Sequence, residues 1–349
     1  MRVISAVDSV SLAVQRTRDF LFRPFTWATY LKLGLVAIVT EGLGSSSHSS
    51  SHGGNTSGHG PVISAPFHIE PVMIAAGVAA VLLALLLSLW VFYLITRLRF
   101  AFFHCLIHNT REIWPGWRLY RSQAMRFFWL NVAVGFCFLL LLVLVALPFV
   151  AGFWRLIRDT PQGGQPDIGL LLSLLLPLIP IILLLVLAAV VIDLILRDCM
   201  LPHFALDNAT AGQAWTRAWA RIKAEKKQFL VYALLRVVLP LIAMVALFVV
   251  LILPGLALAG SFAALEYGLH SAFADATGAA AVAGIVLQAF FGIVAFGFAL
   301  LASICLGGPV STAIREFALI FYGGRYQALG NILYPPPPPP FVEGAPRIA

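Results

Sequence analysis

Long apolar stretches alternate with short polar and basic segments along the chain. We predict membrane-spanning helices at 27–43, 71–96, 128–154, 169–196, 228–260 and 279–307. Most of these exceed the roughly 20 residues that a helix needs to cross a bilayer core. In hydrocarbon, a helix satisfies all of its backbone hydrogen bonds internally. The pattern therefore predicts an all-α, polytopic transmembrane helix bundle of about six spans. The first stretch is short and carries Lys32, so a re-entrant hairpin remains an alternative there.

The composition supports a membrane protein. Of the 349 residues, 60% are hydrophobic and 11% are charged, and the mean hydropathy is +0.93. These values lie outside the range of soluble globular domains. We expect a single membrane-embedded domain at 1–334, a flexible outer loop at 44–70 and a disordered proline-rich tail at 335–349.

The basic residues are distributed unevenly between the two sets of loops. Only Arg155 and Arg158 of the 23 lysines and arginines fall in one set, whereas 44–70 and 261–278 contain none. Because positively charged loops stay on the cytoplasmic side, we expect an inner-membrane protein with both termini in the cytoplasm. The net charge of +8 then reports orientation and gives no support to a nucleic-acid partner.

Two segments have the pattern of interfacial amphipathic helices. Near the N-terminus, apolar or small residues recur every three or four positions at Val3, Val7, Val10, Val14, Thr17 and Leu21. At 207–227, Thr210 and Gln213 form a capping-box pattern. Ala211, Trp215, Ala218 and Ile222 then share one face, and we expect Trp215 and Trp219 to be buried. A loop helix packed on the bundle is the alternative for this segment.

Aromatic residues on one side and cations on the other suit the boundary between acyl chains and headgroups. We predict that anionic membrane lipids are partners, with each cation contributing on the order of 1 kcal/mol. The predicted lipid-interface residues are Trp117, Arg121, Trp215, Arg217, Trp219, Arg221, Lys223, Lys226 and Lys227.

The chain shows signs of internal repetition. Arg97 and Arg197 are 100 residues apart, and Asn109 and Asn208 are 99 apart. We propose three two-span units at 1–96, 97–196 and 197–308, with a fainter fourth helix at 309–327. Chance similarity between apolar spans remains the alternative.

The segment around 202–229 resembles a broad group of prokaryotic six-span membrane proteins of unknown function. The matching residues are Pro202, Ala205, Leu206, Asp207, Asn208, Ala214, Trp219 and Phe229. This group includes the membrane domain attached to some glycerophosphodiester phosphodiesterases. The resemblance implies a six-span fold. It does not imply the phosphodiesterase activity, because the soluble phosphodiesterase domain is absent from this sequence.

Ionisable residues inside apolar spans are costly and therefore informative. We predict an intramembrane pair between Asp193 and Arg236, with Arg197 as a competing partner. Lys32 is a further candidate for a polar path, and Glu41 is expected near the outer surface. A gating or ion-relay site and a structural pair both remain open.

The sequence offers little catalytic chemistry. It contains no phosphate loop, zinc-protease motif or nucleophile elbow. His48, His52 and His59 are weak metal candidates without an accompanying carboxylate or thiolate. We therefore predict no catalytic residues, no resident metal, no cofactor and no enzyme.

Two functional hypotheses follow. The first is a membrane-organising or scaffold protein with basic amphipathic helices on the inner leaflet. The alternative is a transporter or channel for a small solute or lipid, with Asp193, Arg236 and Lys32 facing a cavity. The glycine-rich last span leaves an oligomer open, and the proline-rich tail leaves a cytoplasmic partner open.

Overall fold

The computed structural model describes residues 5–45, 71–159, 168–273 and 277–335. These residues form helices and turns, without a strand among them. In chain order, the elements are α1 (Ala6–Phe22), α2 (Trp27–Ser45), α3 (Pro71–His108), α4 (Ile113–Leu119), α5 (Arg121–Asp159), α6 (Ile168–Leu194), the π-helix η1 (Ile195–Met200), α7 (Leu201–Leu206), α8 (Ala211–Ala224), α9 (Lys226–Phe273), α10 (Ala279–Gly323) and α11 (Gln327–Leu333).

Five helical stretches are long and apolar enough to cross a membrane, which confirms the all-helical membrane bundle. They lie in α3, in α5, in α6 with η1 and α7, in α9 and in α10. The helices extend beyond the predicted spans, and the predicted separate helix at 309–327 is wrong because α10 continues to Gly323. The first predicted span forms α2, which is unbroken and is not one of the five.

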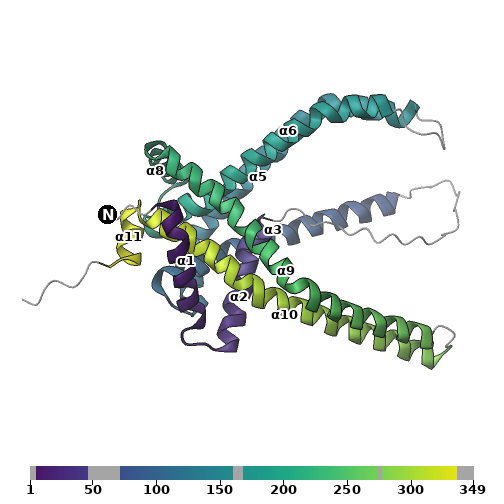
Figure 1. The fold of residues 1–349 in the computed structure, drawn as a ribbon. Coiled ribbons are helices and arrows are strands. Elements are labelled where there is room, and N and C mark those ends of the chain that lie inside the picture. The colour runs from purple at the N-terminus through teal and green to yellow at the C-terminus, as the bar shows by residue number, and fades with distance from the viewer. Residues whose placement is uncertain (1–4, 46–70, 160–167, 274–276, 336–349) are drawn as a thin grey trace, which may run out of the picture.

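The helices separate into a packed layer and projecting arms (Figure 1). We use "packed layer" for α1, α2, α4, η1, α7, α8 and α11 together with the adjoining ends of α3, α5, α9 and α10. From this layer, α5 with α6 and α9 with α10 project as two paired arms, and α3 lies between them. The arms present rows of exposed leucine, valine and phenylalanine side chains, as expected for surfaces that contact lipid.

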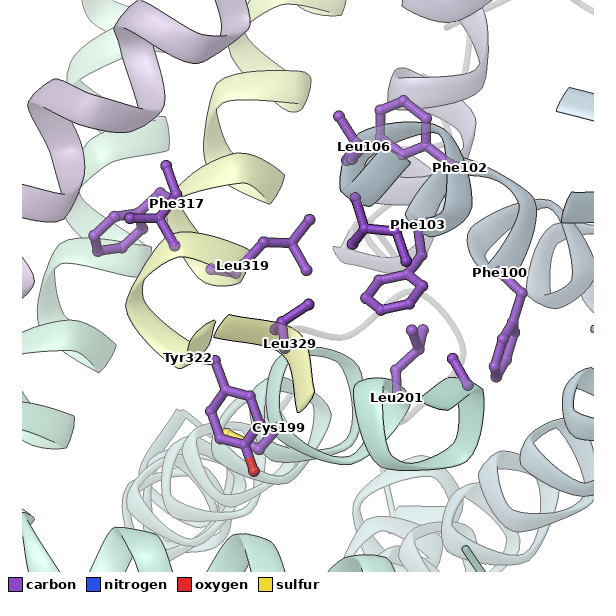
Figure 2. Packing of buried hydrophobic residues seen from close by; sticks show 14 of the residues in the cluster. Phe100, Phe102, Phe103, Leu106, Cys199, Leu201, Phe317, Leu319, Tyr322 and Leu329 are labelled. Atoms are coloured by element: carbon purple, nitrogen blue, oxygen red, sulfur yellow. The ribbon is translucent and has the colours of Figure 1, made fainter. Parts of the chain in front are cut away.

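The hydrophobic core lies in the packed layer (Figure 2). It joins aromatic and aliphatic side chains from the C-terminal end of α3, from η1 and α7, from the C-terminal end of α10 and from α11. Examples are Phe100, Phe103, Leu106, Leu201, Phe317, Tyr322 and Leu329, all almost completely buried. Because these residues come from distant parts of the sequence, the layer brings all the long helices together at one end.

The helix α2 runs beside the last third of α10 in the same direction. Tyr30 Oη donates to the carbonyl of Cys305, and Glu41 near the other end of α2 pairs with Arg315. Between these contacts the two helices cross at Gly34 and Gly308, where the absence of side chains lets the backbones touch. The expectation that Glu41 lies near the outer surface is therefore wrong, because α2 carries it into the packed layer.

The helix α8 confirms the predicted capping box. The Thr210 amide donates to Gln213 Oε1 at 3.2 Å, and the Gln213 amide donates to Thr210 Oγ1 at 3.5 Å. Trp215 and Trp219 are not buried against the protein, since their exposed fractions are 38% and 40%. Small side chains allow closer helix packing, so α8 contacts the protein through Ala214 and Ala218 and leaves the tryptophans outside.

The helix α1 also packs against the protein mainly through small side chains. Its buried residues are Ala6, Ser9, Ala13, Thr17, Phe20 and Leu21, whereas Val7 and Val14 are exposed. The predicted apolar stripe therefore divides between the protein, which Thr17 and Leu21 contact, and the surface, where Val7 and Val14 lie. Mostly small residues pack α1 against α10, and the exposed valines remain available to lipid.

Candidate functional site

A cluster of mostly buried charged residues joins six elements, with Asp193 coming from the end of α6. We call it the arginine cluster, and it contains Arg99, Arg197, Arg236, Arg315, Glu41, Asp193 and Asp198. The four arginines come from α3, η1, α9 and α10, and Glu41 comes from α2. Four cations face three carboxylates, so the cluster is nearly neutral. Burying so many charges is costly unless each is paired and hydrogen-bonded.

Arg236 and Asp198 form the centre of the cluster. Arg236 Nε donates to Asp198 Oδ2 at 3.0 Å, and Arg236 Nη2 donates to Glu41 Oε2 at 2.8 Å. Arg315 Nη1 donates to Asp198 Oδ1 at 3.0 Å. The Tyr232 hydroxyl donates to Asp198 Oδ2 at 2.6 Å. A single aspartate therefore links η1, α9 and α10.

The backbone of α2 supplies a further acceptor. The Thr40 carbonyl accepts hydrogen bonds from Arg99 Nε at 3.1 Å and from Arg197 Nη2 at 2.7 Å. These two hydrogen bonds add to the negative side of the cluster and fix α2 to α3 and η1.

The π-helix η1 places two adjacent charged residues, Arg197 and Asp198, in the same cluster. The six residues of η1 are all buried, including Arg197 and Asp198. A π-helical turn has wider i→i+5 hydrogen bonding than an α-helical turn and often occurs at specialised sites. The Arg197 carbonyl accepts a hydrogen bond from Arg315 Nη1 at 3.1 Å, so both the backbone and the side chains of η1 contribute.

The structure shows the competing pair of Asp193 with Arg197 and not the predicted pair of Asp193 with Arg236. Asp193 pairs with Arg197 one turn later at 3.1 Å, and Arg236 pairs with Asp198 and Glu41. Asp193 and Arg197 are four residues apart, which places them on the same helix face. Lys32 is exposed and lies outside the cluster, because nine residues of α-helix place it on the opposite face of α2 from Glu41.

A second polar cluster surrounds His203, which is completely buried. His203 Nδ1 is 3.0 Å from Asp207 Oδ2, and Nε2 is 2.9 Å from the Tyr322 hydroxyl and 2.8 Å from Arg221 Nη1. An arginine can only donate, so Nε2 accepts and the proton lies on Nδ1, which donates to Asp207. This His203 cluster connects α7, α8 and α10.

Asp207 ends α7 and contacts both the His203 cluster and α8. Arg217 Nη1 donates to Asp207 Oδ2 at 2.8 Å. Burial tends to raise the pKa of Asp207, but interactions with Tyr326 and His203 and the charge of Arg217 outweigh it. The pKa of this carboxyl is therefore lowered, and the ionised form stabilises the junction of α7 and α8.

The predicted lipid-interface residues mostly lie at the rim of the packed layer. We call the exposed members Trp215, Trp219, Arg121, Arg217, Lys223, Lys226 and Lys227 the basic aromatic rim. The rings of Trp215 and Trp219 stack at 5.9 Å, and Lys223 lies over the Trp219 ring. Two of the predicted lipid-interface residues are not part of this rim. Arg221 points into the His203 cluster, and the partly buried Trp117 lies under Arg97.

The motif residues of the 202–229 segment have structural positions. Pro202 opens α7, and Asn208 has a left-handed backbone with φ of 49°. Asn109, its predicted counterpart, also has a left-handed φ, of 52°. Both turns connect the end of a long helical stretch to a short helix of the packed layer. The sequence motif is therefore a helix end, a tight turn and a helix start.

Some predictions fall on residues that the structure does not describe. The metal candidates His48, His52 and His59 lie at 46–70, and most of the proline-rich tail lies at 336–349. Within the described ranges, no group of three or more histidine, cysteine or acidic residues could hold a metal ion. The four cysteines are all free.

Sequence reasoning missed several residues of the arginine cluster, namely Arg99, Asp198 and Arg315. Each is a charged residue at the end of a long apolar run, and that position is the signal that could have identified it. The convergence itself could not be predicted, because it depends on the continuation of α3 and α10 beyond the predicted spans and on the direction of α2.

Comparison with known proteins gives one result for this chain. A model of a family of unknown function (DUF7544) matches residues 4–332. No curated protein and no solved structure matches the chain. The comparisons show no link to the membrane domain of glycerophosphodiester phosphodiesterases. The match covers nearly the whole sequence, and the chain therefore belongs to the family of unknown function DUF7544.

Proposed function

We propose that the protein is a non-enzymatic membrane scaffold of the inner membrane, with its packed layer at the cytoplasmic leaflet. Its basic aromatic rim binds anionic phospholipid. The observation that carries this proposal is the orientation of α8. Its alanine face packs against the protein, and its stacked tryptophans and its lysines remain outside.

Exposed indole rings and cations on one helix are the combination that suits the headgroup region of a bilayer. The apolar part of each tryptophan lies among acyl chains, and the neighbouring lysines reach anionic phosphates. The arrangement of Trp114 and Arg118 on α4 is similar, because the guanidinium lies 4.8 Å from the exposed indole ring. Two helices from different parts of the chain thus present the same chemistry.

The arginine cluster supports a scaffold rather than a pathway. Arg197, Arg236 and Arg315 are at most 11% exposed and pair with Glu41, Asp193 or Asp198. A buried cluster with its charges paired holds helices together and leaves little charge for a passing solute. The transport alternative placed Lys32 beside Asp193 and Arg236. Lys32 is exposed and lies outside the arginine cluster, which gives that alternative no support.

The distribution of charge supports the cytoplasmic placement of the packed layer. The rim lysines Lys223, Lys226 and Lys227 and the arginines near α4 all belong to this layer. Cytoplasmic segments near membrane spans carry an excess of lysine and arginine. The inner leaflet also carries most of the anionic lipid that such residues attract.

Tryptophan quenching by brominated lipids tests the proposal. A full-length variant keeps Trp219 and replaces the other seven of the eight tryptophans by phenylalanine. It is reconstituted with brominated phosphatidylglycerol or brominated phosphatidylcholine in equal amounts. We expect stronger quenching by the anionic lipid, because the lysines beside Trp219 concentrate it.

The triple substitution Lys223→Gln, Lys226→Gln and Lys227→Gln should remove most of this preference. The matched control Arg18→Gln with Lys32→Gln removes exposed cations elsewhere and should retain it. Equal quenching by both lipids in the parent protein would refute anionic-lipid binding by the rim.

A further inference from the structure

A pocket lies where the corner between α1 and α2 meets the turn between α3 and α4. Its volume is about 620 Å³, within the range of small-ligand pockets. It is lined by Arg23, Pro24, His104, Asn109, Thr110, Arg111, Glu112 and Pro115. We propose that this pocket binds the headgroup of a zwitterionic aminophospholipid, with the phosphate at Arg23 and His104 and the ammonium at Glu112.

Arg111 holds the pocket together, and its donors are used in hydrogen bonds within the protein. Arg111 donates to the carbonyls of Phe20, Arg23 and Pro24, which are the last acceptors of α1 and its corner. On the other side, Gly116 lets α4 lie against α3, since a Cβ there would be 2.8 Å from the Cβ of His104. The two walls of the pocket are thus fixed before any ligand binds.

The two side chains proposed to bind the phosphate, Arg23 and His104, are not held by strong interactions within the protein. The Arg23 side chain is 72% exposed, and its pairing with Asp19 at 3.5 Å is a weak surface contact. His104 lines the pocket and is partly exposed, and because its Nδ1 is buried without a partner among the described residues, the ring would reach a ligand through Nε2. A guanidinium and an imidazole N–H are both good donors to phosphate oxygens.

The ammonium-binding group is Glu112. It precedes α4, but its side chain makes no capping hydrogen bond there. No ion pair of its carboxylate is found within the part of the chain that the structure describes. A carboxylate in the pocket would weaken binding of a purely anionic headgroup, whereas it favours one that also carries a primary ammonium. The combination of cation and anion therefore selects a zwitterion.

The surroundings favour a lipid over a soluble phosphate ester. Phe22, Phe25 and Trp27 at the α1–α2 corner are exposed, and Phe25 stacks on Phe22 at 6.0 Å and meets Trp27 edge to face at 5.1 Å. Trp114 is exposed on α4. Clusters of exposed aromatic residues beside a polar pocket are typical of the membrane interface. In Figure 1 this corner projects from the edge of the packed layer.

Native mass spectrometry of the purified full-length protein in detergent tests the proposal. The probes are phosphatidylethanolamine, phosphatidylcholine and phosphatidylglycerol with identical acyl chains. We expect one phosphatidylethanolamine to bind several-fold more tightly than either of the others. A quaternary ammonium cannot donate a hydrogen bond to Glu112, and phosphatidylglycerol has no cation to offer.

Arg23→Gln should weaken phosphatidylethanolamine binding about tenfold, the usual effect of losing one charged hydrogen bond. Glu112→Gln should lower phosphatidylethanolamine binding to the level of phosphatidylcholine without lowering that of phosphatidylglycerol. The matched control Arg18→Gln removes an exposed arginine outside the pocket and should bind like the parent.

Equal binding of the three lipids, or equal effects of all three substitutions, would overturn the proposal. Displacement of the lipid by an equal concentration of soluble phosphoethanolamine would overturn the choice of a lipid as the ligand. The proposal depends on the proposed function only for the leaflet that supplies the lipid. The rim variant Lys223→Gln, Lys226→Gln and Lys227→Gln should leave this site intact, so the two proposals can fail separately.

Discussion

Gly34 of α2 and Gly308 of α10 touch through their backbones, so that a Cβ atom at Gly308 would lie 2.7 Å from the Gly34 Cα. This contact lets α2 approach α10 closely enough for Glu41 to reach Arg236 and Arg315. The position of the arginine cluster therefore depends on two residues that carry no side chain.

We predict that Gly308→Ala destabilises the protein by about 1–3 kcal/mol, the usual cost of overpacking. Thermal unfolding in detergent would show a lower midpoint. Gly297→Ala is the matched control in the same helix, because nothing lies within 4 Å of its added Cβ. An alanine there should be neutral or slightly stabilising. A Gly308→Ala midpoint equal to that of the control would argue against the close crossing.

Arg236→Leu should be far more damaging than a substitution of Lys32. Removing Arg236 leaves Glu41 and Asp198 as buried carboxylates with fewer partners, at a cost of about 3–5 kcal/mol. Lys32→Gln changes an exposed cation and should alter the free energy of unfolding by about 0.5 kcal/mol or less. Chemical unfolding of both variants measures the difference, and similar values would show that the cluster carries no stability.

The junction of α7 and α8 should depend on acid pH through Asp207. Its folded-state pKa is lowered from the ordinary value of 3.8, so the ionised form contributes stability that is fully present above that value. This contribution is lost as the pH falls below 3.8 through the folded-state pKa. We expect Asp207→Asn to be less stable than the parent at neutral pH and to lose less stability on acidification. Parallel pH profiles of unfolding temperature would contradict this prediction.

The two left-handed asparagines should respond alike to substitution. A β-branched residue at positive φ is strained by about 1–2 kcal/mol, whereas glycine adopts this conformation freely. We predict that Asn109→Val and Asn208→Val both lower the unfolding temperature and that the glycine variants do not. Matching costs at the two positions would support equivalent turns in the proposed repeats. A cost at only one position would argue against that equivalence.

Much of the fold follows from local sequence patterns. Runs of apolar residues predicted the long helices, and Thr210 with Gln213 predicted the start of α8, because both patterns act within a few residues. Burial of Trp215 and Trp219 against the protein could not be predicted, because amphipathicity does not distinguish contact with lipid from contact with protein. Packing density decides between them, and it favoured Ala214 and Ala218.

The candidate site was less predictable than the fold. Asp193, Arg197 and Arg236 were recognised from the cost of burying charge, and all three lie in the arginine cluster. The pairing of Asp193 with Arg197 was one of the two predicted, but the partners of Arg236 were not recognised, because Asp198 depends on the π-helical turn and Glu41 depends on the Gly34–Gly308 crossing. Neither feature has a local sequence signature.

The cytoplasmic placement of the packed layer is the central claim, and site-directed thiol labelling tests it most directly. A protein without its four native cysteines carries one new cysteine at Lys227, which is exposed on the rim. A membrane-impermeant maleimide is applied to right-side-out and to inverted membrane vesicles. The account predicts labelling only in inverted vesicles. Labelling in intact right-side-out vesicles would contradict it.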